Sequence, residues 1–138
     1  MRLLITTLLI FILQNHLLAN TNFFEEGLKL FNKEQFDKAK FKFEQDIVYN
    51  PKSESSYLYL SKIFNKKEKV ELEEKNLNTV IKLNPKNEEA VYHLAKLKLK
   101  TSDFSESKKL VQELLSFCKT YCIKSKQLKS EIDNSLKE

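Results

Sequence analysis

Apolar side chains recur at intervals of three and four residues along most of the chain beyond residue 20. Phe36, Ala39, Phe43 and Ile47 form one such series, and this spacing places all four on one face of a helix. Polar segments without glycine separate one series from the next. The pattern therefore predicts an all-α chain of short amphipathic helices joined by polar turns.

The helical series repeat with a fixed period. Asn-Pro-Lys occurs at residues 50–52 and again at residues 84–86, 34 positions later, and a shift of 34 also brings apolar residues into register. The aligned columns are Phe23, Tyr57 and Val91; Phe24, Leu58 and Tyr92; Phe36, Val70 and Phe104; Phe43, Leu77 and Val111; Ile47, Ile81 and Leu115; and Tyr49, Leu83 and Phe117. Such a period indicates stacked units, here residues 20–53, 54–87 and 88–121.

Each unit is expected to hold two antiparallel helices. Gly27, Ser61 and Ala95 share the eighth position, where a small residue lets one helix cross closely against its partner. Proline disfavours helical geometry in the residue before it, so each Asn-Pro step should end a second helix. Ser53 and Asn87 then stand where an N-cap is useful.

These features resemble the tetratricopeptide repeat. The matching residues of the first unit are Phe23, Gly27, Phe36, Asp37, Ala39, Phe43 and Pro51. The second unit departs from the pattern with Glu73 in place of alanine, and the third with Lys98, Ser107 and Lys119. The resemblance implies an all-α, right-handed superhelical stack of three repeats, followed by a C-terminal capping helix over residues 122–138. The apolar series of that helix is Ile123, Leu128, Ile132 and Leu136.

The resemblance also implies where a partner would bind, because the first helix of each repeat lines a concave groove in this family. The corresponding residues are Phe24, Leu28, Phe31, Leu58, Lys62, Asn65, Lys66, Tyr92, Lys96, Leu99 and Lys100. One end is aromatic and the other rich in lysine, which suits a peptide with apolar anchors and acidic residues. The alternative is that Phe24, Leu28 and Phe31 pack against the neighbouring repeat or a returning signal segment, and that the lysines only face solvent. Residues typical of the family's chaperone-binding carboxylate clamp are absent.

The first 19 residues have the composition of a secretory signal peptide. Arg2 precedes an eleven-residue apolar stretch over residues 3–13, and residues 17–19 offer a cleavage site before Asn20. The alternative is a retained anchor, although a spanning helix needs about 20 apolar residues. Cleavage predicts an exported protein, most simply periplasmic.

Cys118 and Cys122 are the only cysteines. In an oxidising compartment a disulfide between them is expected, although two unpaired thiols remain an alternative. A CxxxC pair with no histidine nearby is a poor zinc or redox motif.

Composition narrows the function further. Lysine and arginine number 24 against 19 acidic residues, and Arg2 is the only arginine, which argues against nucleic-acid recognition. His93 is the only histidine beyond residue 19, and the chain has one glycine, so we expect no enzymatic activity, metal or cofactor.

The leading prediction is an exported scaffold or adaptor that binds a protein or peptide partner in its groove, in envelope protein assembly. One alternative is a membrane-anchored factor whose uncleaved signal and lysine-rich surface contact anionic lipid headgroups. Self-association through the aromatic end of the groove is another. The oligomeric state is left open.

Overall fold

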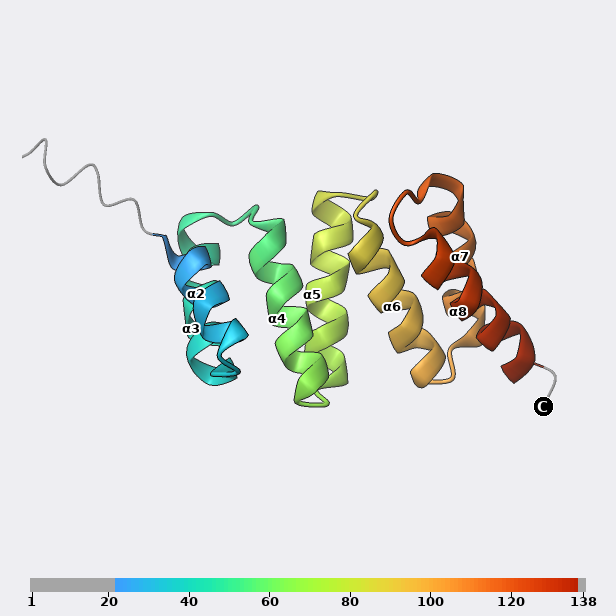
Figure 1. Cartoon of the computed structure of the whole chain (residues 1–138), viewed down its shortest axis with the longest axis horizontal. Coiled ribbons are helices and arrows are strands. Elements are labelled where there is room, and N and C mark those ends of the chain that lie inside the picture. Colours follow the sequence, from blue (N-terminus) through green and yellow to red (C-terminus); the bar gives the residue numbers. More distant parts are fainter. Residues whose placement is uncertain (1–21, 137–138) are drawn as a thin grey trace, which may run out of the picture.

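The computed structural model describes residues 22–136, and within that range the chain is all-α. The helices stand in sequence order along the long axis of the molecule (Figure 1). Their bounds are α2 (Phe23–Asn32), α3 (Phe36–Tyr49), α4 (Glu54–Lys66), α5 (Val70–Leu83), α6 (Glu88–Lys100), α7 (Phe104–Phe117) and α8 (Cys122–Ser135). The expected signal peptide over residues 1–19 lies outside the described residues.

The period of the sequence is also the period of the backbone. Helices α4, α6 and α8 begin 34 residues apart at Glu54, Glu88 and Cys122, and α3, α5 and α7 do the same. Packing is largely between neighbours in sequence, from α2 on α3 through to α7 on α8, as expected for stacked repeats. Helix α8, which we expected as a cap, therefore occupies the place of the first helix of a further unit.

The turns inside the units obtain their shape without glycine. Glu34, Glu68 and Ser102, again 34 residues apart, have left-handed backbone angles with φ between 54° and 61°. The amide after each of these residues donates to a carbonyl five residues earlier, as from Gln35 to Leu30. This is the hydrogen bond that closes a helix at a left-handed residue, a position that glycine usually occupies.

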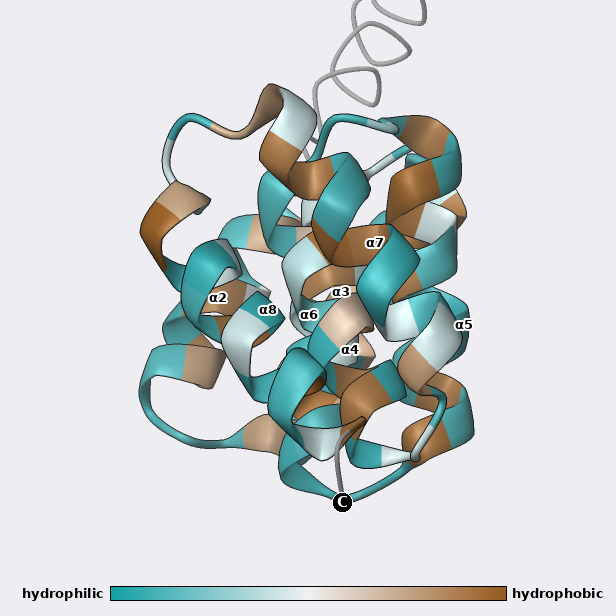
Figure 2. Cartoon of the chain, turned by 90° about the vertical axis from the view of Figure 1, so that its right-hand side faces the viewer, coloured by the Kyte–Doolittle hydropathy of each residue, from teal (hydrophilic) through white to brown (hydrophobic). Residues whose placement is uncertain are grey.

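One of the columns that the pattern predicted is buried in every unit, whereas Tyr49 of another is 69% exposed. Phe43, Leu77 and Val111 are all fully buried at equivalent places in successive units. Gly27 is buried where α2 crosses α3 closely. A Cβ atom there would lie 2.7 Å from the ring of Phe43, so the crossing has no room for a side chain. Figure 2 shows hydrophobic and hydrophilic residues alternating along the helices, as in helices with one buried face.

At the helix starts, one expected cap is confirmed, one is wrong and one was not predicted. Asn87 caps α6 by accepting a hydrogen bond from the amide of Ala90, but Ser53 makes no such bond and donates to Ser56 instead. Asp103 caps α7, which the sequence reading missed.

The buried face of α8 was also predicted at the wrong angle. Leu128 and Ile132 are buried as expected, but Ile123 is 74% exposed and Leu136 is 51% exposed. Ser125 is fully buried in their stead, and its hydroxyl donates to the carbonyl of Tyr121, four residues earlier. A serine whose hydroxyl bonds to its own helix can enter a core that sequence hydropathy assigns to an isoleucine.

Candidate functional site

Two adjoining hollows mark the face formed by the first helices of the units. Their volumes are about 280 and 220 Å³, and both are lined by Asn65, Glu73 and His93. We call the two together the groove. The larger hollow is completed by Lys96, Leu97, Leu99, Lys100 and Glu131, and the smaller by Phe31, Ser61, Lys62 and Lys66. Except for Glu73 of α5, these residues come from α2, α4, α6 and α8, so the groove runs across the stack.

Most of the residues predicted for a groove do meet there. Those that line it are Phe31, Lys62, Asn65, Lys66, Lys96, Leu99 and Lys100, whereas Phe24, Leu28, Leu58 and Tyr92 do not. Leu58 is a core residue with 8% exposure, and the ring of Tyr92 packs on that of Tyr121 at 5.2 Å. The periodic assignment therefore found the helices that line the groove but not every side chain.

An aromatic cluster joins the first unit to the second. The ring of Tyr59 lies 5.0 Å from that of Phe31, 5.8 Å from that of Phe24 and 5.3 Å from that of Phe43. Such contacts between aromatic rings stabilise a core beyond the burial of their area. Phe24 thus packs against the next unit, as the alternative reading held, while Phe31 both packs and lines the smaller hollow.

Lysines make the groove electropositive. The Nζ atom of Lys62 pairs with Glu89 at 2.8 Å and lies 4.4 Å from the centre of the Tyr59 ring. Lys96 and Lys100 are exposed, and no carboxylate of residues 22–136 lies within ion-pair distance of either. These two ammonium groups are therefore available to an acidic ligand.

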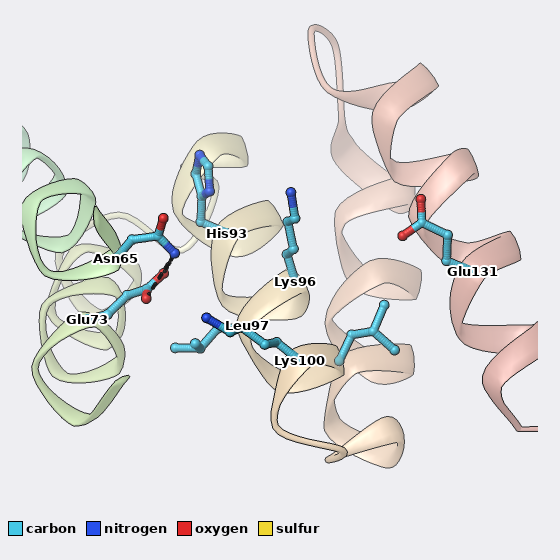
Figure 3. A pocket seen from close by; sticks show the side chains of 8 residues that line it. Asn65, Glu73, His93, Lys96, Leu97, Lys100 and Glu131 are labelled. Atoms are coloured by element: carbon cyan, nitrogen blue, oxygen red, sulfur yellow. Dashed lines mark hydrogen bonds between the residues drawn. The ribbon is translucent and has the colours of Figure 1, made fainter. Parts of the chain in front are cut away.

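A buried carboxylate lies at the centre of the groove. Glu73 is only 4% exposed, and the side-chain amide of Asn65 donates to both of its oxygens, at 3.0 and 3.1 Å (Figure 3). Burial raises the pKa of Glu73, because a low-dielectric environment disfavours the charged form. The sequence shows Glu73 only as a departure from alanine. A charged residue in a column that otherwise holds the small residues Ala39 and Ser107 is the feature that could have pointed to this site.

His93 lines both hollows. Its Nε2 atom lies 3.8 Å from a carboxylate oxygen of Glu89, one turn earlier on α6. The neighbouring His93 and Lys62 side chains lower the pKa of Glu89 to about 2. Glu89 therefore keeps its charge at neutral pH and binds the ammonium group of Lys62 at the rim of the groove.

The turn that leads into α8 is closed by a disulfide. Cys118 and Cys122 are bonded, as predicted, with Cα atoms 5.3 Å apart. The amides of the three residues between them, 119–121, all donate to the carboxylate of Glu88 at 2.8 Å. These bonds lower the pKa of Glu88. In the third unit a disulfide loop thus takes the place of the Asn-Pro turn of the first two units, and Glu88 of α6 binds the backbone of that loop.

Two further kinds of site were sought among residues 22–136. No three histidine, cysteine, aspartate or glutamate side chains gather there in a way that could hold a metal ion. None of the helices in that range combines the length and the hydropathy that crossing a bilayer requires.

A row of paired helices with a hollow on the side of the first helices is the fold of tetratricopeptide-repeat domains, and solved structures share it. The first tetratricopeptide domain of Spaghetti (RPAP3), bound to an HSP90 peptide, superposes with a TM-score of 0.77 at 16% identity, covering 84% of this chain and 91% of that one.

Two further neighbours agree. The TPR2B domain of yeast Sti1 in its complex with an Hsp70 peptide gives a TM-score of 0.76 at 13% identity, covering 83% of this chain and 95% of that one. The Yersinia enterocolitica type III secretion chaperone SycD, in complex with a peptide of the translocator YopD, gives 0.77 at 11% identity, covering 85% and 93%. At these identities the likeness shows the fold. No family model and no curated protein matches the sequence.

Proposed function

We propose that this protein is a scaffold that holds a peptide segment of a partner protein in the groove. The observation that carries the proposal is the groove itself, which crosses the stack and joins the aromatic ring of Phe31 to the exposed ammonium groups of Lys96 and Lys100. An apolar side chain fits the first and an acidic side chain the second. The peptides bound by the three neighbours named above support the same use of the same fold.

The proposal includes export. Residues 1–19 would be removed as a signal peptide, and the protein would act in the periplasm, in envelope protein assembly, with no catalytic step of its own. The disulfide is consistent with an oxidising compartment. N-terminal sequencing of the exported form tests this directly, since we expect it to begin at Asn20.

Peptide selection tests the binding function. Random dodecapeptides displayed on phage would be selected on the purified protein, and the affinity of the best sequence measured by calorimetry. We expect peptides with an aromatic or aliphatic anchor and at least one acidic residue. Lys96→Ala with Lys100→Ala should weaken binding about tenfold, because two favourable charge contacts are lost.

The matched control removes two lysines elsewhere. Lys38 and Lys126 are exposed and do not line the groove, so Lys38→Ala with Lys126→Ala changes the net charge equally. Equal weakening by both pairs would mean that only overall charge matters, and failure to select any peptide would refute the function.

The second candidate, a membrane-anchored factor, is favoured by the same exposed lysines. It predicts that the protein keeps residues 1–19 and floats with vesicles of phosphatidylglycerol, and that salt reduces this binding. An exported form that begins at Asn20 and does not float would exclude it.

A further inference from the structure

We propose that Glu73 makes the centre of the groove a subsite for an uncharged hydrogen-bond donor of the bound peptide, an amide or hydroxyl side chain, and excludes an acidic side chain there. Acidic residues of the peptide would instead lie beside Lys96 and Lys100. This inference rests on the proposed peptide-binding function and specifies the chemistry of its ligand.

The position of Glu73 has no parallel in the other units. Ala39 and Ser107 occupy the same column, and both are fully buried where the two helices of their unit meet. The hydroxyl of Ser107 donates a buried hydrogen bond to the carbonyl of Ala95 at 2.8 Å. The longer side chain of Glu73 instead passes between the helices and lines both hollows (Figure 3).

The carboxylate of Glu73 has acceptor capacity to spare. Its two oxygens offer about four lone-pair sites, and among residues 22–136 only the amide of Asn65 donates to them. The carbonyl oxygen of that same amide receives no hydrogen bond from those residues either. Each carboxylate oxygen of Glu73 therefore has a further lone pair that a donor of the bound peptide can reach from the groove.

The surrounding charges select a neutral donor. His93, Lys96 and Lys100 of α6 and Lys62 and Lys66 of α4 line the groove around Glu73, with Glu131 of α8 at its far side. An ammonium or guanidinium group from the peptide would have to approach the ammonium groups of these four lysines closely. An acidic side chain would meet the buried carboxylate directly, at a depth where water screens little. An amide or hydroxyl avoids both penalties.

Aspartate scanning tests the subsite. The peptide chosen by the selection above would be resynthesised with Asp at each position in turn, and each version measured against wild type, Glu73→Gln and the control Glu71→Gln. Glu71 is an exposed residue of the same helix that lies outside the groove. Wild type and Glu71→Gln should lose at least tenfold in affinity when Asp occupies one central position, and Glu73→Gln should lose threefold or less there.

Each outcome decides the matter. A penalty at the central position that persists in Glu73→Gln, or an Asp profile without any such position, overturns the subsite but leaves peptide binding intact. Failure to select a peptide overturns both. If Glu73→Gln does not melt cooperatively by circular dichroism, Glu73→Ala, which introduces the residue found at position 39, serves for the same comparison.

Discussion

The disulfide loop provides the sharpest test of how the stack ends. Lys119 stands where the first two units have a proline, and the turn from α7 to α8 is closed instead by the bond between Cys118 and Cys122. Replacing both cysteines in Cys118→Ser with Cys122→Ser opens this loop without changing the size of either side chain greatly. We expect α8 to be held less firmly, because its entry angle then depends only on Glu88 and on packing.

The magnitude follows from loop closure. A bond that closes about five residues restricts the unfolded chain by roughly 2 kcal/mol in the chain-entropy model. For a domain of this size that corresponds to a fall of roughly 8 °C in the melting temperature. The loss should appear in α8 first, since stacked repeats can open from an end.

Urea unfolding followed by circular dichroism, with and without dithiothreitol, measures the total effect. Wild type should lose about 2 kcal/mol on reduction, and the double serine variant should not respond. Hydrogen exchange should accelerate in α8 and remain unchanged in α4 and α5. If the reduced protein keeps its stability and its exchange protection in α8, the disulfide does not hold this turn and the reasoning is wrong.

Three further predictions concern stability. Ser102→Gly should raise the free energy of unfolding by about 0.5–1 kcal/mol, since glycine adopts a φ of 61° without strain; a loss on urea titration would contradict this. Gly27→Ala should cost about 1–3 kcal/mol, because the added Cβ meets the ring of Phe43, and Phe43→Leu should relieve part of that cost in the double variant. The carboxyl of Glu89 has its pKa lowered from 4.5 to about 2, so its contribution to stability should be complete above about pH 5 and disappear as pH falls towards 2; Glu89→Gln should then differ from wild type at pH 7 and not at pH 2.

The repeat made most of the fold predictable. Once Pro51 and Pro85 set the period, the expected helix pairs and the buried column of Phe43 followed, because each unit must bury the same face against its neighbours. The disulfide was expected from the spacing of the two cysteines together with the predicted export. These predictions needed only the period of the sequence and the spacing of the cysteines, and no knowledge of individual side-chain contacts.

The parts that could not be predicted depend on individual side chains. Hydropathy favours burial of Ile123 over Ser125, yet Ser125 is buried and Ile123 is exposed. The role of Glu73 likewise depends on its side chain reaching the groove, where it lines both hollows, and the sequence does not show this. The position of Phe24 in its repeat predicts a groove residue, yet its ring packs against that of Tyr59 of the next unit, beside the core.

The most direct test of the account is to map the bound peptide onto the protein by NMR, using the isotope-labelled protein and the selected dodecapeptide. If the peptide binds in the groove, we expect the largest chemical-shift changes at the side-chain amide of Asn65 and in α6 around His93 and Lys96. Changes centred instead on the exposed Phe41 and Val48 of α3 would show that the peptide binds elsewhere and would contradict the account.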